Sequence, residues 1–218
     1  MPELAQKAIR ILLIDDHALF REGLARLLAY DPEFEVAAAC ASIEEGLAFL
    51  TQGPIDIVLL DSCLGERNGK EFLRLSREQD FSGKVLLVTA GVNEGDAAEL
   101  IRAGISGIFL KRDSPGLLAQ AIRHVVGGGV WFKQEQLENV INSGAPVLSE
   151  VKNDRFTKRE QQVLSCVFNG FTNQRIAEQI GVSTGSVKST LQQLFSKTGV
   201  RTRSQLVRIV LEQYKDRL

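Results

Sequence analysis

The sequence predicts an α/β protein of two domains: a doubly wound, five-stranded parallel sheet followed by a smaller all-α helix-turn-helix domain. Three observations lead to this prediction. Strand-sized apolar runs alternate with amphipathic helical patterns five times in the first half of the chain, whereas the last part has helical patterns alone. The length of 218 residues, with 44% hydrophobic and 24% charged residues, fits two small globular domains and is too apolar for a disordered chain.

The first half of the chain supplies the strands and helices of the predicted sheet. Five short runs are rich in Ile, Val and Leu, at 11–14, 36–40, 57–60, 85–88 and 108–110. Five segments carry apolar residues at three- and four-residue spacing, at 17–29, 43–51, 69–78, 94–103 and 115–126. Ser42 precedes one of these helices and Ser114-Pro115 opens the last, as expected for helix N-termini. Strand–helix repetition requires right-handed crossovers, which produce a parallel sheet with helices on both faces.

A linker and four helices follow the predicted sheet. Gly127 to Gly129 end the last helix of the sheet domain, residues 134–142 have the pattern of one short helix, and Asn142 to Asn153 are typical of a flexible connection. Four helical segments separated by glycine-containing turns come next, at 158–169, 173–179, 184–197 and 203–214. The predicted divisions are the sheet domain, the linker and the helix-turn-helix domain, at 8–127, 128–153 and 154–218.

Charge divides along the same lines although the formal net charge is −1. Residues 1–127 carry 13 Lys and Arg against 19 Asp and Glu, a balance of −6. Residues 151–218 carry 12 against 5, a balance of +7. Such asymmetry is typical of a nucleic-acid-binding part joined to an acidic part with another task. Two unrelated solvated surfaces are the alternative, and charge alone leaves both open.

Other sequence features exclude several classes of protein. No apolar run approaches the ~18 residues of a membrane span, and the N-terminus lacks the apolar stretch of a signal peptide. We therefore expect a cytoplasmic protein without a membrane partner. The three cysteines are far apart and form no CxxC pair, which argues against a disulfide framework or a zinc site.

Polar side chains lie at the end of four of the five predicted strands. Asp15 and Asp16 follow the first strand, Asp61 the third, Thr89 ends the fourth and Lys111 follows the fifth. The carboxyl ends of parallel strands line one crevice, so these side chains should converge. Carboxylates gathered in this way suit Mg²⁺, and Thr89 and Lys111 would stabilise a phosphoryl group transferred to Asp61 as nucleophile. Each residue taken alone is more often a helix cap or a solvated terminus.

These segments resemble a response-regulator receiver domain of the NarL/LuxR branch over about residues 9–126. The matching motifs are ILLIDDHALFREGL at 11–24, LLD at 59–61, NG at 68–69, VTA at 88–90 and GIFLK at 107–111. The resemblance implies a flavodoxin-like fold in which Asp61 accepts a phosphoryl group from a sensor histidine kinase. It also implies that Mg²⁺ is held by Asp15, Asp16, Asp61 and the backbone carbonyl of Cys63, that Lys111 pairs with the phosphoryl group, and that Thr89 moves toward it.

Two positions depart from the receiver pattern. Gly65 stands where the family usually has proline, which loosens the loop beside the phosphoacceptor. Ile108 occupies the position of the family's switch aromatic, and the neighbouring Phe109 should face the other side of its strand. These departures put the usual ring rotation in question, while Thr89 is still expected to move. His17 follows the acidic pair, and we expect it to serve the start of a helix rather than bind metal or act as a base.

The second domain carries a spaced set of residues, which are Leu164, Gly170, Asn173, Ile176-Ala177, Ile180, Val182-Ser183, Ser186-Val-Lys188, Leu191, Lys197, Gly199-Val200, Arg203 and Gln205-Leu-Val207. With these residues the domain resembles a LuxR-type DNA-binding domain across residues 154–214. Thr157 with Glu160 forms a predicted capping box, and Thr172 and Ser183 begin the next two helices. In such a domain the second helix of the helix-turn-helix enters the major groove. With the apolar residues of helix 184–197 facing the core, the polar residues left for DNA or solvent are Ser186, Lys188, Ser189, Gln192 and Gln193. A small helical bundle whose polar stripe is only solvated is the alternative, which periodicity alone leaves open. The resemblance places Lys188, Ser189 and Gln192 at base-reading positions, Lys197, Arg201 and Arg203 at phosphate contacts, and Leu206, Ile209, Val210 and Tyr214 on a dimerisation helix.

The sequence therefore predicts a response-regulator transcription factor that is phosphorylated on Asp61, uses Mg²⁺ and binds double-stranded DNA as a homodimer on activation. It is not predicted to be an enzyme. A regulator that does not depend on phosphorylation is the first alternative, supported by Ile108 and Gly65. A Mg²⁺-dependent phosphohydrolase using Asp61 is the second. The Asp61-Ser-Cys63 segment lacks the acid that such an enzyme typically has near its nucleophile.

Overall fold

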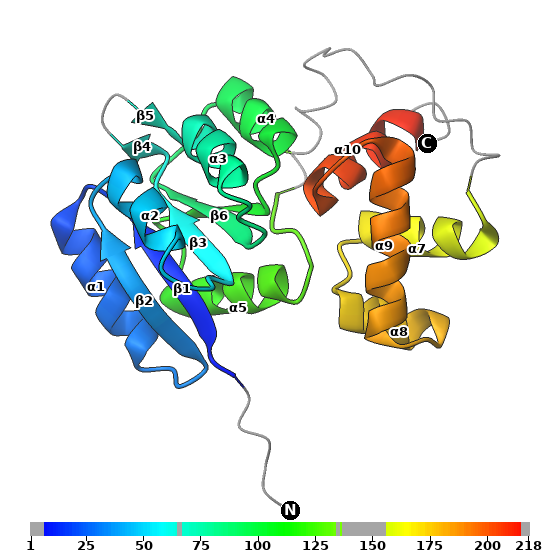
Figure 1. Cartoon of the computed structure of the whole chain (residues 1–218), viewed down its shortest axis with the longest axis horizontal. Coiled ribbons are helices and arrows are strands. Elements are labelled where there is room, and N and C mark those ends of the chain that lie inside the picture. Colours follow the sequence, from blue (N-terminus) through cyan, green and yellow to red (C-terminus); the bar gives the residue numbers. More distant parts are fainter. Residues whose placement is uncertain (1–6, 65–66, 134–135, 137–155, 215–218) are drawn as a thin grey trace, which may run out of the picture. The chain divides into compact units, whose positions relative to one another are not determined.

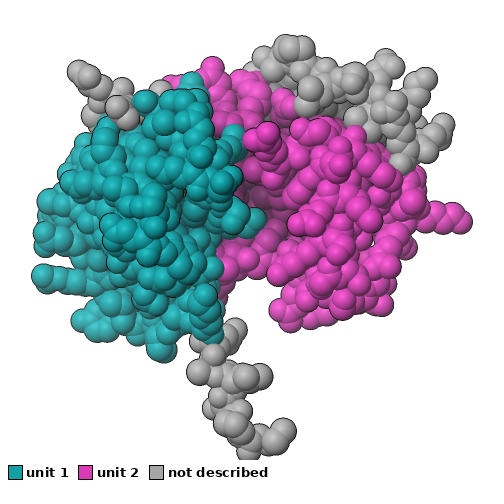
Figure 2. Space-filling model, in the orientation of Figure 1, with its two compact units in different colours: residues 1–91, 108–122 teal, residues 92–107, 123–218 magenta. Residues whose placement is uncertain are grey.

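The computed structural model describes residues 7–64, 67–133, 136 and 156–214 (Figure 1). The chain forms two compact units (Figure 2). The first comprises Met1–Gly91 with Ile108–Ile122, and the second comprises Val92–Gly107 with Arg123–Leu218. The second unit thus takes in a segment of the predicted sheet domain, residues 92–107, together with the C-terminal helices.

A five-stranded sheet forms the centre of the α/β part. Its strands are β1 (Ile9–Ile14), β2 (Phe34–Cys40), β3 (Ile57–Leu60), β6 (Lys84–Thr89) and β7 (Gly107–Leu110), in the order β2-β1-β3-β6-β7. The pairs β1–β2, β1–β3 and β3–β6 are parallel. The order places β1 inside the sheet, between strands that follow it in sequence, as crossover connections on both faces require. The doubly wound parallel sheet predicted from the sequence is confirmed.

The helices of the α/β part agree with the predicted patterns to within one residue at each end. They are α1 (Ala18–Ala29), α2 (Ile43–Leu50), α3 (Gly69–Glu78), α4 (Glu94–Ala103) and α5 (Pro115–Val126). A short antiparallel pair, β4 (Cys63–Leu64) and β5 (Arg67–Asn68), is additional. The sequence did not predict this pair because a strand of two residues has no side-chain alternation to detect.

The sheet core explains why the strands read as continuous apolar runs. All four residues of β3 are buried, as are Ile11 to Ile14 of β1, because helices cover the sheet on both faces (Figure 1). Gly46 lets α2 approach β1 closely, since a Cβ at this position would lie 2.3 Å from Cδ1 of Ile14. On the other face, α1 and the start of α5 line a common cavity of about 400 Å³ with Phe109.

The second unit contains the four predicted C-terminal helices, α7 (Lys158–Phe168), α8 (Asn173–Ile180), α9 (Thr184–Thr198) and α10 (Arg203–Tyr214). Apolar side chains from all four form one core, which includes Val163, Ile176, Val187 and Leu206. Helix α4 belongs to this unit through α10, where Nε2 of Gln205 donates a hydrogen bond to the carbonyl of Arg102 at 2.8 Å. The predicted all-α helix-turn-helix arrangement is confirmed.

The connection between the two predicted domains is described in part. Trp131 N–H donates to the carbonyl of Ser106, and the Trp131 ring lies edge-on to His124, with 5.9 Å between ring centroids. The short helix expected within 134–142 lies outside the described residues apart from Gln136. Among the described residues, no helix combines the length and the apolar character of a membrane span.

Candidate functional site

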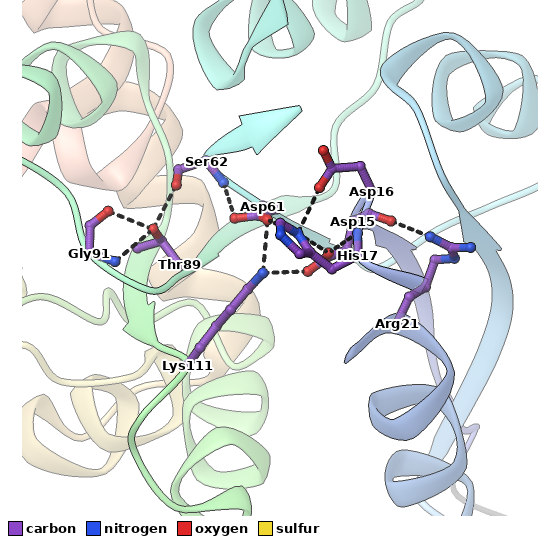
Figure 3. Close-up of polar contacts among 9 residues, drawn as sticks. All are labelled: Asp15, Asp16, His17, Arg21, Asp61, Ser62, Thr89, Gly91 and Lys111. Atoms are coloured by element: carbon purple, nitrogen blue, oxygen red, sulfur yellow. Dashed lines mark hydrogen bonds and ion pairs between the residues drawn. The ribbon is translucent and has the colours of Figure 1, made fainter. Parts of the chain in front are cut away.

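The predicted acidic residues lie at the carboxyl ends of adjacent strands, as the sheet order requires. The backbone N–H of Asp61, directly after β3, donates to the carbonyl of Ile14 at 2.9 Å. The N–H of Lys111, directly after β7, donates to the carbonyl of Thr89 at 2.7 Å. Residues as far apart in sequence as Asp15 and Lys111 therefore share one edge of the sheet (Figure 3).

Lys111 bridges two buried carboxylates at this edge. Its Nζ lies 2.7 Å from Oδ2 of Asp15 and 2.8 Å from Oδ2 of Asp61. Burial lowers the pKa of Lys111, but the hydrogen bonds and charges of these two carboxylates outweigh it and leave the pKa above its ordinary value. The ammonium also lies over the Phe20 ring, 4.4 Å from its centroid. Lys111 is therefore held as a cation beside Asp61.

Thr89 does not contact Asp61 directly. Its hydroxyl lies 2.6 Å from Oγ of Ser62, donates to the carbonyl of Gly91 at 2.7 Å and accepts from the N–H of Gly91 at 3.1 Å (Figure 3). The N–H of Ser62 donates to Oδ1 of Asp61 at 2.7 Å. Ser62 thus links Thr89 to Asp61, the predicted phosphoacceptor. Sequence reasoning missed it, although its place directly after Asp61 was the available signal.

His17 lies over the acidic residues although the sequence suggested only a helix-start role. It occupies the N-cap position of α1, but its side chain makes no capping hydrogen bond. Nδ1 lies 2.8 Å from Oδ1 of Asp16, 3.4 Å from Oδ1 of Asp15 and 3.7 Å from Oδ2 of Asp61. The structure therefore turns the imidazole back onto the carboxylates (Figure 3).

The donor atoms of this edge fit a divalent cation. One ligand atom from each of Asp15, Asp16, His17 and Asp61 lies within 4.8 Å of the others. Carboxylate oxygens from three residues are the ligands that Mg²⁺ prefers, and Asp16 is exposed, so one side of the group is open to an incoming phosphoryl group. Cys63, whose backbone carbonyl is the fourth predicted oxygen ligand, begins β4 two residues after Asp61.

The two departures from the receiver pattern have different outcomes. Ile108 is buried in β7, and Phe109 faces the cavity lined by α1 and the start of α5. Phe109 thus lies on the α1 side of the sheet together with Lys111, as the two-residue period of a strand requires. Gly65 lies outside the described residues.

The predicted base-reading residues share the exposed face of α9. Lys188, Ser189 and Gln192 are exposed, while Val187, Leu191 and Leu194 point into the core. Ser186 is partly buried, and its hydroxyl lies 3.0 Å from Oγ of Ser183, the residue that caps the helix. A polar stripe on the second helix of a helix-turn-helix is the arrangement that major-groove reading requires.

The three predicted phosphate contacts are placed differently from one another. Arg201 is exposed. Lys197 is partly exposed, and its Nζ lies 2.7 Å from Oε2 of Glu160. Arg203 is buried: its guanidinium donates to the carbonyl of Phe171 and to Oδ1 of Asn173, and burial lowers its pKa to about 10. Arg203 therefore makes its hydrogen bonds inside the domain, and it is not placed for the phosphate contact predicted from the sequence.

The predicted dimerisation residues also divide. Leu206 and Ile209 are buried in the core of the helical unit, so neither presents a free surface. The side chains of Val210 and Tyr214 lie outside the described set. Over at least the first two turns of α10, the apolar side chains therefore pack in the core of their own unit.

Comparison with known families agrees with this geometry. The family described as "Response regulator receiver domain" matches residues 11–123. The family described as "Bacterial regulatory proteins, luxR family" matches residues 154–210.

Relatives and solved structures give the same result. The transcriptional regulatory protein ComA of Bacillus subtilis is 33% identical over 92% of this chain and 96% of its own length. A nitrate/nitrite response regulator homolog of Haemophilus influenzae is 30% identical over 95% of this chain and 99% of its own. A two-component response regulator of the LuxR family from Aurantimonas is 29% identical, with a TM-score of 0.57, over 62% of this chain and 97% of that one.

A further structure shares the fold. It is RcsB from Salmonella enterica bound to promoter DNA in the presence of a phosphomimetic, with 17% identity and a TM-score of 0.56 over 95% of this chain and all of that one. The converging acidic strand ends, the exposed polar stripe of α9 and the two family matches have one explanation. The chain belongs to the two-component response regulators that join a receiver domain to a LuxR-type DNA-binding domain.

Proposed function

We propose that this response regulator is phosphorylated on Asp61 by a sensor histidine kinase and then binds double-stranded DNA as a homodimer. The observation that carries the proposal is the position of Lys111, whose ammonium bridges Asp15 and Asp61 at 2.7 and 2.8 Å. A fixed cation beside the nucleophile is what charge development on a transferring phosphoryl group requires.

The transfer follows from the groups around Asp61. A carboxylate oxygen of Asp61 attacks phosphorus, the bond from phosphorus to the kinase's histidine nitrogen breaks, and its electron pair stays with that nitrogen. Lys111 then pairs with a phosphoryl oxygen in place of the Asp61 oxygen it now contacts. Bound Mg²⁺, held by Asp15, Asp16, Asp61 and the Cys63 carbonyl, would offset the charge of the phosphoryl oxygens.

Thr89 is the residue that reports the modification in this proposal. Its hydroxyl now contacts Ser62 and Gly91. A phosphoryl oxygen on Asp61 is a stronger acceptor than either, because it is charged. Thr89 therefore turns toward Asp61 and leaves Gly91, which changes the loop after β6. A local charge change of this kind biases the chain between two conformations.

The DNA-binding step uses α9. Lys188, Ser189 and Gln192 reach base edges from its exposed face, with Ser186 beside them. Lys197 and Arg201 contact phosphates, which position the helix without specifying sequence. Val210 and Tyr214, at the end of α10, remain the proposed dimer contacts. In this proposal the regulator works in the cytoplasm and is not an enzyme.

Replacing Asp61 by Asn tests the phosphoacceptor. Labelling by a small phosphodonor such as acetyl phosphate should be abolished, because an amide is not a nucleophile toward phosphorus, while folding is retained because the side chains are of equal size. Labelling is measured by intact-protein mass spectrometry. Asp80→Asn makes the same chemical change at a position with φ of 57°, a conformation that Asn tolerates, and should be labelled like the wild type. Labelling of Asp61→Asn at the wild-type level would refute the assignment.

The same samples separate the alternatives. We expect beryllofluoride to increase both oligomer size and DNA affinity in the wild type and to change neither in Asp61→Asn. Equal affinity and size with and without beryllofluoride in the wild type would favour the phosphorylation-independent regulator. Repeated turnover of a phosphate ester would favour the phosphohydrolase.

A further inference from the structure

We propose that His17 is a nitrogen ligand of the acidic metal site and that it makes the site selective for first-row transition dications over Mg²⁺. The inference rests on the proposed function in that the ion occupies the site beside Asp61. It goes further by assigning a role to a side chain outside the carboxylate and carbonyl set.

The first argument is distance. Nδ1 of His17 lies 2.8 Å from Oδ1 of Asp16 and 3.4 Å from Oδ1 of Asp15. Atoms bound about 2.1 Å from an octahedral ion are about 3.0 Å apart when they occupy adjacent corners. The imidazole nitrogen is therefore already spaced from two carboxylate oxygens as ligands of one ion are, and little movement is needed for it to bind.

The second argument is the division of the Asp15 oxygens. Lys111 contacts Oδ2 of Asp15, whereas His17 approaches Oδ1 of the same carboxylate. The ammonium and the imidazole thus use different oxygens, so an ion on the His17 side does not require Lys111 to leave Asp15. Nζ of Lys111 and Nδ1 of His17 both approach Oδ2 of Asp61, at 2.8 and 3.7 Å. An ion bound by His17 would therefore compete with Lys111 for this oxygen.

The third argument is that His17 has no other structural task at its position. It occupies the N-cap of α1 without a side-chain hydrogen bond to the helix, and its side chain is 66% exposed. The helix start is held instead through Asp15: the N–H of His17 donates to Oδ1 of Asp15 at 2.8 Å, and the guanidinium of Arg21 donates to the Asp15 backbone carbonyl. The imidazole is consequently free to turn, and it turns onto the carboxylates.

Ligand chemistry then determines the class of ion. Mg²⁺ is a hard cation that takes oxygen ligands and gains little from nitrogen. Imidazole suits first-row dications such as Fe²⁺, Co²⁺, Ni²⁺, Cu²⁺ and Zn²⁺, whose affinities rise from Fe²⁺ to Cu²⁺ and fall again at Zn²⁺. A site of three carboxylates and one imidazole should therefore bind these ions more tightly than the carboxylates alone, with no matching gain for Mg²⁺.

The test compares Co²⁺ with Mg²⁺ on the full-length protein by calorimetry, in the wild type, His17→Gln and Asp16→Asn. In His17→Gln we expect Co²⁺ affinity to fall at least about tenfold, the scale seen even for outer partners of metal sites, and Mg²⁺ affinity to change less than about twofold. Asp16→Asn removes an oxygen and should weaken both ions. Unchanged Co²⁺ affinity in His17→Gln would overturn the proposal. An equal loss of Mg²⁺ affinity would also overturn it, because it would show that His17 only positions the carboxylates.

Spectroscopy identifies the ligand independently of affinity. Co²⁺ bound to the wild type should show a paramagnetically shifted, exchangeable imidazole proton that is absent from His17→Gln. An absorption band typical of cobalt–thiolate bonding would instead place the ion on a cysteine and would refute the assignment. Labelling with acetyl phosphate in Mg²⁺ is measured in parallel. Wild-type protein that is not labelled, but that loses Co²⁺ affinity on His17→Gln, would reject the proposed function and retain this inference.

Discussion

Glu160 shows how one buried side chain ties two helices of the DNA-binding domain together. It is the third residue of α7, and its Oε2 accepts from the N–H of Thr157 at 2.8 Å, which completes the predicted capping box. The same oxygen lies 2.7 Å from Nζ of Lys197 near the end of α9. Burial pushes the pKa of Glu160 up, but the hydrogen bonds from Lys197 and Thr157 outweigh it and lower the pKa below its ordinary value.

Replacing Glu160 by Gln should reveal this contribution as a pH-dependent loss of stability. A carboxylate with a lowered folded-state pKa stabilises the fold above its unfolded pKa of about 4.3 and loses that effect as pH falls through the folded value. We expect a loss of about 1.5–3 kcal/mol at neutral pH, the range for hydrogen bonds to charged groups, and a smaller difference below about pH 4.

Hydrogen exchange of the α7 and α9 amides localises this effect. Glu178→Gln, at an exposed position on α8 where Gln174 donates to the carboxylate, is the matched control and should change stability by less than about 0.5 kcal/mol. If Glu160→Gln loses the same amount of stability at every pH, then Glu160 contributes through its packing and not through its ionised carboxylate.

At the scale of elements, α8 and α9 illustrate how the sequence specifies the helix-turn-helix. Thr172 and Ser183 cap the two helices, each accepting a hydrogen bond from the third residue of its helix. Gly181 ends α8 with φ of 69° and ψ of 44°, the left-handed conformation that glycine adopts without strain. These residues set both the ends and the turn, which is why the sequence prediction is confirmed here almost to the residue.

Two alanine substitutions in this segment should have opposite effects. Gly181→Ala has open space for its Cβ but must adopt the left-handed conformation, so we expect destabilisation by about 1–2 kcal/mol. Gly185→Ala lies within α9, where a Cβ would make only an ordinary contact at 3.7 Å with the Ser183 hydroxyl, so we expect stabilisation by about 0.5–1 kcal/mol. Urea unfolding followed by circular dichroism measures both. Equal shifts of the same sign would show that the φ of Gly181 is not what decides its identity.

At the scale of the whole molecule, charge is segregated along the chain. Residues 1–127 have a balance of −6 and residues 151–218 a balance of +7, so attraction to the DNA backbone belongs to the C-terminal part. The net negative charge of residues 1–127 opposes binding to DNA, and this part of the chain contains the proposed cation site. Binding by the full chain should therefore weaken steeply as salt concentration rises.

Lys188→Ala measures what one exposed cation of α9 contributes to that binding. If Lys188 reads a base, affinity for the selected operator should fall by about 1–3 kcal/mol, with a smaller effect on unrelated DNA. Lys7→Ala, an exposed lysine of the acidic part, is the control and should bind like the wild type. Fluorescence anisotropy at several salt concentrations provides the measurement. Unchanged affinity together with no salt dependence would contradict recognition through α9.

The five strands of the parallel sheet, the described helices, the caps Thr157, Thr172 and Ser183, and the gathering of Asp15, Asp61 and Lys111 could be predicted from the sequence. Each depends on local periodicity or on the rule that parallel strands end at one edge. The partners of Ser62 and His17, the inward direction of Arg203 and the burial of Leu206 were decided by the tertiary structure. These depend on which side-chain conformations remain open once distant segments pack together, and no local pattern encodes that choice.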